Sequence, residues 1–189
     1  MKEHARVVTV FGSGRAQPDD PLYAQALALG IALAEKGFSV CTGGYGGVME
    51  AVSRGAKQAG GHTIGITARF FRSRANAWID EEIRVATWKD RLFELVERGH
   101  GYVTCPGGTG TLVELAIVWE MVNKGVMEKK PVAIFGEFWR PVIERVREAE
   151  RAGSTGSGGH EEPLIHVALS ARDAAEHLSR HLGVRPGAR

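Results

Sequence analysis

The stretch Tyr102-Val-Thr-Cys-Pro-Gly-Gly-Thr-Gly-Thr-Leu-Val-Glu114 joins a short β-prone run to a glycine-rich turn and then to a largely apolar helix. The turn contains three glycines, Gly107, Gly108 and Gly110. Because they carry no Cβ, the backbone can tighten there and expose its N–H groups. These groups and the positive end of the following helix form an anion site, most naturally for a phosphate. We expect the helix to begin near Thr109–Thr111.

Glu114 lies one turn into this helix, close to any ligand at the glycine turn. Thr111 and Glu114 also match the Ser/Thr-x-x-Glu pattern of a capping box, in which both residues would only stabilise the helix start. The pattern alone favours the cap. The alternative is that Glu114 faces the bound ligand.

The rest of the chain alternates strands with helices. Predicted strands are 7–11, 38–41, 63–66, 83–86, 103–105, 132–135 and 165–168, and predicted helices are 22–36, 48–59, 88–98, 112–123, 141–152 and 171–182. Strands separated by helices of this length need crossover connections, which produce a parallel sheet. The sequence therefore predicts an α/β fold, a Rossmann-like doubly wound parallel sheet with helices on both faces.

Ligands of such folds bind beyond the carboxyl ends of the strands, and three glycine turns are predicted there. The candidate phosphate-binding residues are Gly12, Ser13, Gly43, Gly44, Gly46, Gly47, Gly107, Gly108, Thr109, Gly110 and Thr111. A dinucleotide fingerprint is incomplete, because Gln17 stands where its third glycine belongs and Cys41-Thr42 replaces the acidic residue after the second strand. No P-loop sequence occurs. With these two nucleotide-binding motifs excluded, the glycine turns offer backbone amides that suit a single phosphate.

Composition narrows the class further. The 189 residues, 43% hydrophobic and 24% charged, predict one domain over residues 1–189, with a flexible loop at 153–159 and a frayed tail at 185–189. A net charge of +2 does not indicate a nucleic acid partner, and no apolar run is long enough for a membrane span. Two cysteines and scattered histidines form no metal motif. We expect a cytoplasmic protein without a metal.

Four blocks of this sequence resemble one family, the LOG ("Lonely Guy") cytokinin riboside 5′-monophosphate phosphoribohydrolases, also described as lysine decarboxylase-like. Pro106-Gly-Gly-Thr-Gly-Thr-x-x-Glu114 is similar to the family signature. Thr42-Gly-Gly-Tyr-Gly-Gly-Val-Met-Glu-Ala51 is similar to a second family block, and Val10-Phe-Gly-Ser-Gly14 to a third. Arg91 stands at the place of the family arginine before the Pro-Gly-Gly loop. The resemblance covers about residues 6–135.

The resemblance implies hydrolysis of the N-glycosidic bond of a nucleoside 5′-monophosphate, with Arg91 and Glu114 as catalytic residues and no cofactor. Its substrate would be a small-molecule nucleotide, and its working unit a homodimer or larger homo-oligomer. Without the resemblance, Arg91 would belong to the solvated face of the 88–98 helix. The family's usual Met-x-x-Arg-Lys is Trp88-Lys-Asp-Arg-Leu92 here, so the lysine after the arginine is lost. The identity of the base, and whether its N6 is substituted, is not encoded in any motif.

A second function stays open. Molybdenum cofactor carriers have a similar glycine signature and bind a nucleotide-like ligand without turning it over. A carrier has no need of a paired cation and carboxylate across a ribose, so Arg91 and Glu114 separate the two functions. A pyridoxal phosphate decarboxylase is a poor match, because the chain is short for that class.

Some further residues have more than one interpretation. Cys41 and Cys105 are expected at strand ends as buried thiols rather than nucleophiles, and Glu50 either stabilises the first turn of its helix or contacts a substrate hydroxyl. Asn76 belongs to a lid, a dimer contact or a plain loop. An excess of large apolar residues on two helices predicts a subunit interface; they are Trp88, Phe93, Leu95, Trp119, Met121 and Val122.

Overall fold

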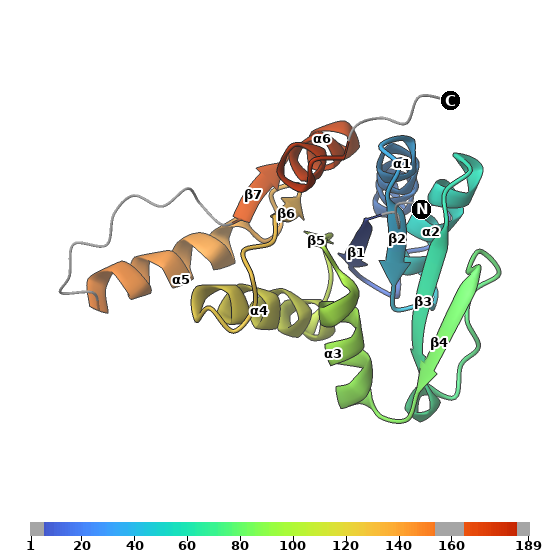
Figure 1. Cartoon of the computed structure of the whole chain (residues 1–189), viewed down its shortest axis with the longest axis horizontal. Coiled ribbons are helices and arrows are strands. Elements are labelled where there is room, and N and C mark those ends of the chain that lie inside the picture. The colour runs from blue at the N-terminus through green and yellow to red at the C-terminus, as the bar shows by residue number, and fades with distance from the viewer. Residues whose placement is uncertain (1–5, 154–164, 185–189) are drawn as a thin grey trace.

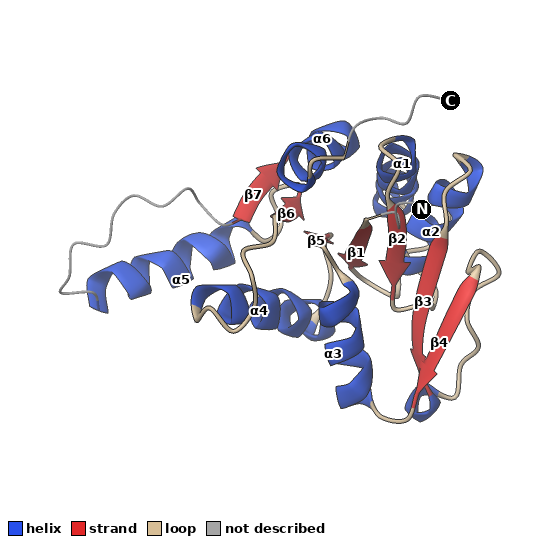
Figure 2. Ribbon diagram, in the orientation of Figure 1, coloured by secondary structure: helices blue, strands red, loops and turns tan. Residues whose placement is uncertain are grey.

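The computed structural model describes residues 6–153 and 165–184, which form one parallel sheet with helices on both sides (Figure 2). The strands are β1 (Val7–Phe11), β2 (Ser39–Thr42), β3 (Thr63–Ala68), β4 (Glu81–Val85), β5 (Gly101–Thr104), β6 (Val132–Phe135) and β7 (Ile165–Ala168). The helices are α1 (Pro21–Glu35), α2 (Val48–Gln58), α3 (Trp88–Arg98), α4 (Thr109–Asn123), α5 (Arg140–Gly153) and α6 (Ala171–Leu182), with a 3₁₀ turn, η1, over Arg69–Phe71.

The strand order is β4-β3-β2-β1-β5-β6-β7, and every pairing is parallel. Helices α1, α2 and α6 cover one face of the sheet, and α3, α4 and α5 lie on the other (Figure 1). This arrangement confirms the predicted doubly wound sheet. The chain builds outward from β1 to β4, then crosses back and continues from β5 on the other side of β1, so the winding reverses between β1 and β5.

The central strands are almost continuously apolar because helices bury both of their faces. Val8, Val10 and Val103 point into a core shared with α1, α2 and α6, whereas Phe11 and Tyr102 point into a second core under α3 and α4. Successive side chains on a strand alternate between the two faces. Each strand therefore contributes to both cores, and its carboxyl end is held firmly at the edge where the glycine turns follow.

Helices α1 and α2 pack unusually closely because each has a glycine at the contact. A Cβ on Gly30 would collide with the backbone oxygen of Val52, and a Cβ on Gly55 would collide with that of Leu27. Glycine inside a helix costs roughly 1 kcal/mol relative to alanine. The close approach of the two backbones offsets this cost and positions α2, whose first turn borders the site.

The connection between β3 and β4 differs from the others because it contains η1 and no α-helix. Both strands are longer than the sequence predicts at this point: β3 continues to Ala68 and β4 begins at Glu81, because Ile64–Ala68 pairs with Glu81–Val85 along its whole length. β4 is an edge strand with exposed charged residues. Such charges protect an unpaired edge from association with other strands.

Toward the end of the chain, α5 continues to Gly153, so the predicted loop does not begin there. Residues 154–159 of that loop and the predicted tail 185–189 lie outside the described residues. In the part of the chain that the structure describes, no helix combines the length and the apolar character needed to cross a membrane.

Candidate active site

A cavity of about 560 Å³ lies at the carboxyl edge of the sheet, where the winding reverses between β1 and β5. This is the place where open α/β sheets bind their ligands. Its walls come from the turns after β1, β2 and β5, from η1, and from the first turns of α2, α3 and α4. Nine of the predicted site residues line it: Gly12, Ser13, Gly43, Arg91, Gly108, Thr109, Gly110, Thr111 and Glu114.

The three glycine turns are locked to one another by backbone hydrogen bonds. Ser13 donates its N–H to the oxygen of Pro106 at 3.1 Å and accepts from the N–H of Val48 at 2.8 Å. Gly12 is needed for this contact, because a Cβ there would lie 2.5 Å from Val48 Cγ1. Turns that are far apart in the sequence thus form one rigid rim around the cavity.

Four predicted binding residues, Gly44, Gly46, Gly47 and Gly107, do not line the cavity. Gly44 and Gly47 have φ angles of 75° and 69°, a conformation that side chains other than glycine rarely adopt. A Cβ on Gly107 would collide with the hydroxyl of Thr111. At least three of the four therefore shape the turns that carry the lining residues.

The first turn of α4 opens into the cavity. Its N-cap is Gly108, no side chain caps it, and the first backbone bond of the helix runs from the Leu112 N–H to the Gly108 oxygen. The backbone N–H groups of the residues before Leu112, at the start of α4, belong to those that a helix leaves without intrahelical partners. A Cβ on Gly108 or Gly110 would have no atom within 4 Å, so packing does not require glycine at either position. Glycine there keeps the approach to the helix N-terminus open.

The capping box that Thr111 and Glu114 could form is not present. Because α4 begins at Thr109, Thr111 already lies inside the helix and cannot act as its N-cap. Its side chain is buried and lines the cavity. The Glu114 carboxylate instead lies 3.8 Å from Nη1 of Arg91, measured from Oε1. The capping interpretation is therefore wrong, and Glu114 belongs to the cavity wall.

Arg91 is buried, with 7% of its surface exposed, so the solvated face expected from the helix pattern is wrong at this position. Its Nε donates to the Ile66 oxygen at 2.8 Å, and its Nη2 donates to the Gly43 oxygen at 3.1 Å. A Cβ on Gly43 would overlap the guanidinium, so this glycine makes room for it. The guanidinium carbon also lies 5.3 Å from the ring centre of Tyr45 and 5.5 Å from that of Phe71.

Burial dominates the electrostatics of the pair. It raises the pKa of Glu114 from 4.5 to about 7, although the nearby Arg91 charge acts in the opposite direction. Burial likewise lowers the pKa of Arg91, partly countered by Glu114. At 3.8 Å the two groups form an ion pair without a close hydrogen bond. A carboxyl group that titrates near neutral pH is suited to accept or hold a proton during a reaction.

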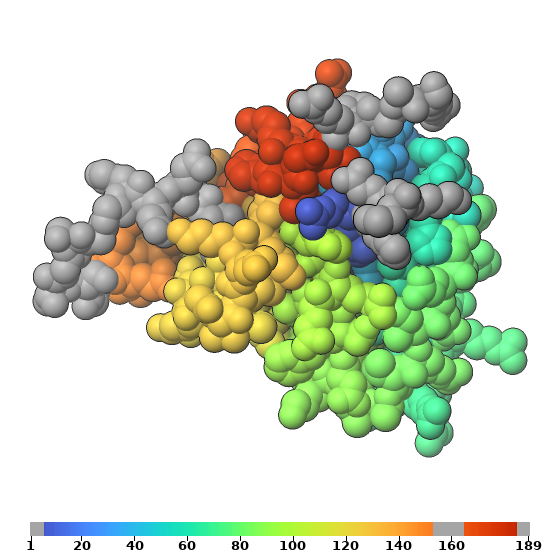
Figure 3. Space-filling model, viewed as in Figure 1, coloured from blue at the N-terminus to red at the C-terminus, as the bar shows by residue number. Residues whose placement is uncertain are grey.

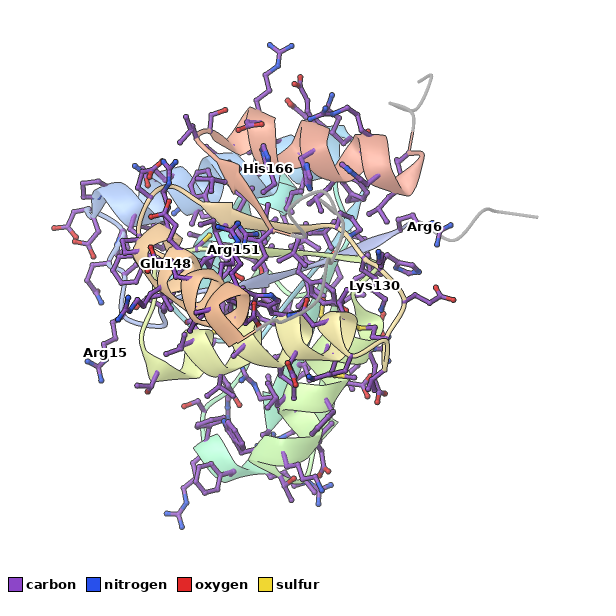
Figure 4. All side chains as sticks on the ribbon, turned by 90° about the vertical axis from the view of Figure 1, so that its left-hand side faces the viewer. Arg6, Arg15, Lys130, Glu148, Arg151 and His166 are labelled. Atoms are coloured by element: carbon purple, nitrogen blue, oxygen red, sulfur yellow. The ribbon has the colours of Figure 1, made fainter. Side chains whose placement is uncertain are left out.

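Sequence reasoning missed several lining residues, namely Arg15, Tyr45, Met49, Phe71 and Leu92. Tyr45 stands inside the Gly-Gly-Tyr-Gly-Gly turn, which was a signal in its favour, whereas nothing in the sequence connects Phe71 with the site. Arg15 adds an exposed cation to the lining, and Figure 4 shows its side chain extending away from the ribbon.

The start of α3 is fixed by a capping box. Asp90 forms a capping box with Thr87, accepting from the Thr87 backbone N–H at 3.1 Å. One turn later, Arg98 and Glu94 form an ion pair on the polar side of the helix, 2.6 Å from Nε to Oε1. Trp88 is not part of the core, because 43% of its surface is exposed and its side chain lines the cavity.

The remaining candidates have structural contacts. Asn76 donates its backbone N–H to the Gly44 oxygen and its side-chain amide to the Tyr45 oxygen, at 2.8 and 2.9 Å, so it fastens the second glycine turn. Glu50 accepts from the Tyr23 hydroxyl at 3.2 Å. Cys41 and Cys105 are fully buried, which raises both thiol pKa values to about 12. Among the described residues, no group of His, Cys, Asp and Glu side chains could hold a metal ion.

Comparison with known proteins shows the family to which this chain belongs. The family model of the SLOG cluster4 family matches residues 5–155. The chain belongs to the SLOG cluster4 family. This confirms the resemblance to LOG proteins, because several relatives of this SLOG chain are named cytokinin riboside 5′-monophosphate phosphoribohydrolase.

One such relative, from Mycobacterium marinum, is 35% identical over 123 residues, which cover 63% of this chain and 66% of the relative. An uncharacterized protein of Archaeoglobus fulgidus is 33% identical over 129 residues, 68% of this chain and 83% of that protein. Among solved structures, the molybdenum cofactor carrier protein of Chlamydomonas reinhardtii has a TM-score of 0.73 and 26% identity, covering 95% of this chain and 99% of that one. The matched part thus spans just under two thirds of the M. marinum phosphoribohydrolase.

Proposed function

We propose that the protein hydrolyses the N-glycosidic bond of a purine nucleoside 5′-monophosphate to the free base and ribose 5-phosphate. The observation that carries this proposal is the pair of the buried Arg91 and the largely buried Glu114, 3.8 Å apart, in a cavity that the N-terminus of α4 also borders. A cation, a carboxylate and an anion site in one cavity are the groups that this reaction requires. The names of the relatives support the same activity.

In the reaction, a water oxygen bonds to C1′ of the ribose while the bond from C1′ to the base nitrogen breaks. One proton of the water ends on the released base. Positive charge develops on the sugar in the transition state, and negative charge develops on the base. Glu114 would stabilise the sugar charge and orient or deprotonate the water, and Arg91 would stabilise the departing base.

The phosphate would bind at the glycine rim. The open amides of α4, the Gly12–Gly14 turn and the hydroxyls of Ser13 and Thr111 offer donors there. Binding energy from this remote group can position the ribose against the carboxylate, which accelerates the reaction without contact to the breaking bond.

A second candidate function is a carrier of a nucleotide-like ligand. It is favoured by the similarity to the molybdenum cofactor carrier over nearly the whole length of both chains. Such a protein would use the same glycine rim to bind its ligand and would release no base. The largely buried carboxyl of Glu114, with a pKa of about 7 and 3.8 Å from Arg91, favours the hydrolase, because binding a phosphate requires no acid beside the cation.

The deciding experiment is to incubate the protein with AMP, N6-isopentenyl-AMP and adenosine and to follow the free base by chromatography. We expect release from a nucleotide and far slower release from adenosine, which lacks the phosphate anchor. Equal rates for AMP and adenosine would contradict phosphate binding at the rim. Tight binding of AMP with no base released would identify a carrier.

A further inference from the structure

Two large aromatic side chains on the cavity wall remain uncovered. Trp88 is 43% exposed and Phe71 is 39% exposed, and both line the cavity. Aromatic side chains that line a cavity and remain partly exposed are typical of a place where a ligand binds. The polar roles assigned above to the glycine rim, Glu114 and Arg91 leave these two rings without a function.

The contacts around Arg91 show where the rings stand relative to the reactive groups. The edges of its guanidinium are used by the Ile66 and Gly43 oxygens and by Glu114. Its central carbon lies 5.5 Å from the Phe71 ring centre. Trp88 precedes Arg91 by three residues on α3, so the two side chains share one face of the helix. The aromatic wall therefore adjoins the charged pair directly.

The aromatic rings on this wall differ in how many hydrogen bonds and ring contacts they already make within the protein. The Tyr45 hydroxyl is bonded to both the N–H and the oxygen of Ala68, and its ring meets Phe71 edge to face at 5.5 Å between centres. Phe71 also contacts Phe70 and Arg91. By contrast, the Trp88 indole has no hydrogen bond and no ring contact with any residue that the structure describes.

The backbone of Trp88 is nevertheless well fixed. It is the first residue of α3, directly after Thr87, which forms the capping box with Asp90. A capping box holds the start of a helix through two reciprocal hydrogen bonds. A flat ring on a fixed backbone position, uncovered and beside the catalytic cation, is a suitable platform for another flat ring.

We propose that Trp88, together with Phe71, is the platform on which the base of the nucleotide stacks, so that Trp88 selects a flat heteroaromatic leaving group. This inference rests on the proposed function, since it takes the base to lie beside Arg91. Stacking on an aromatic side chain depends on the ring face, which every base has, and it tolerates different substituents. Trp88 therefore favours planar bases as a class over a non-aromatic aglycone.

The test is a calorimetric titration with AMP and with ribose 5-phosphate, which has the sugar and phosphate but no base. All proteins carry Glu114→Gln, so that AMP is not consumed during the titration. In this background Trp88→Leu removes the ring and keeps an apolar side chain, Trp88→Phe keeps a ring, and Phe138→Leu is the control. Phe138 is 55% exposed and does not line the cavity.

We expect Trp88→Leu to weaken AMP binding about tenfold, within the range that alanine substitution of stacking residues produces. Ribose 5-phosphate should bind within about twofold of the parent protein, because the platform does not touch it. Trp88→Phe should recover most of the AMP affinity, and Phe138→Leu should change neither ligand. A thermal melt of each variant excludes unfolding as the cause.

Two results would overturn the inference. One is unchanged AMP binding in Trp88→Leu, and the other is an equal loss for AMP and ribose 5-phosphate, which would place Trp88 at the sugar or phosphate. Failure of the proposed function is visible separately, in the protein without Glu114→Gln. If that protein releases no base but AMP binding still depends on the ring at position 88, the hydrolase proposal fails and the platform stands.

Discussion

At the scale of single residues, Glu114 connects the local sequence with the proposed chemistry. Its position three residues after Thr111 fits a capping box. That role is excluded because α4 begins at Thr109, so Thr111 is not the N-cap residue. Once the cap is excluded, the residue is a largely buried acid, with 14% of its side chain exposed, beside a buried cation. A buried carboxyl without a full set of partners costs stability, and such residues are common at functional sites.

The first prediction concerns removal of this charge. Glu114→Gln should lower kcat by about 10²–10³, the size commonly found for an electrostatic group in an active site. The melting temperature should change little, because the variant removes a carboxyl that is costly to bury but also removes the ion-pair partner of the buried Arg91, and these two effects oppose each other. The control is Glu148→Gln on α5, where the carboxylate is exposed, lies 3.1 Å from Nη1 of Arg145 and lines neither the cavity nor the groove between α4 and α5. Retained activity in Glu114→Gln would remove Glu114 from the mechanism.

The second prediction concerns pH. If Glu114 acts as a carboxylate, kcat/KM should rise with pH and reach a plateau above its pKa of about 7. Its contribution to stability has the opposite sign. The folded pKa is higher than the unfolded value of 4.5, so the folded state binds more protons between these values and stability falls as pH rises through this window. Rate profiles and melts from pH 4.5 to 8.5 measure both trends, and Glu114→Gln should abolish both. A flat rate profile would contradict the role.

At the scale of secondary structure elements, the site is an assembly of helix and strand ends. The turns after β1, β2 and β5 meet because parallel strands end at the same edge. Helix α3 brings Arg91 under the edge, and α4 brings both its open N-terminus and Glu114. Displacement of either helix by a small distance would separate the pair, so the packing of Leu92, Leu95 and Leu115 also supports the site.

A third prediction concerns β7 and α6, at the other end of the sheet from β4. The rings of His166, His177 and His181 lie in succession, with 4.3 Å between neighbouring centres, and His166 contacts Asp173 at 3.0 Å. Figure 4 shows His166 beside α6. Burial, with a smaller effect of the neighbouring histidines and of Arg180, lowers the pKa of His177 from 6.5 to about 4, while Asp173 acts in the opposite direction.

Because the folded state holds His177 neutral while the unfolded chain binds a proton, stability should decrease as pH falls from 6.5 to 4. His177→Phe keeps a ring in the stack and cannot be protonated. Its melting temperature should therefore drop less than that of the parent protein between pH 7 and pH 5. The exposed His62 at the start of β3 supplies the control as His62→Gln. An equal drop in parent and His177→Phe would show that the stack does not sense pH.

At the scale of the whole molecule, the predicted excess of apolar residues on α3 and α4 is largely used inside the chain. Leu95, Trp119 and Val122 are buried, and Met121 packs against the core. Of the six residues named in support of an interface, Trp88 is the one exposed large side chain, and it lines the cavity. Three of these six residues are therefore buried inside the chain, and the homo-oligomer itself stays a prediction.

A different apolar surface is present between α4 and α5. It is a groove of about 230 Å³ whose apolar lining residues are Leu112, Leu115, Ala116, Trp119, Val142 and Val146. The side chains of α4 and the loop after it, in yellow, lie beside those of α5, in orange (Figure 3). Leu112 follows the cavity residue Thr111 directly, so this surface adjoins the candidate site.

As the fourth prediction, we expect the working unit to be a homodimer that associates through this groove. Val146→Glu would add a carboxylate to a groove that already contains Glu120 and Glu150, and it should shift the protein to a monomer. Val126→Glu is the control, since Val126 is 71% exposed and lies outside the groove. Sedimentation velocity at micromolar concentration measures the outcome. A parent protein that is monomeric and fully active would contradict the prediction.

The sequence by itself determined the fold class and most of the elements. Hydrophobic runs of strand length, separated by helices and glycine turns, allow few arrangements other than a parallel sheet with its turns at one edge. It also marked the two residues of the charged pair, but only through resemblance to a family. The local pattern placed Arg91 on a solvated face and Glu114 in a cap. Hydrophobic periodicity shows on which side of its own helix a side chain lies, but it does not show which other segments pack against that side.

Tertiary structure alone decided which segments pack against the side chains of the site. The crossing of α3 over the ends of β2 and β3 buries Arg91 against the Ile66 and Gly43 oxygens, which are 25 and 48 residues away in the chain. The same packing leaves Trp88 and Phe71 uncovered in one cavity. Burial, and with it the pKa of Glu114, depends on atoms contributed by distant segments. No local pattern contains that information, so the chemistry of this site depends on the packing of the whole domain.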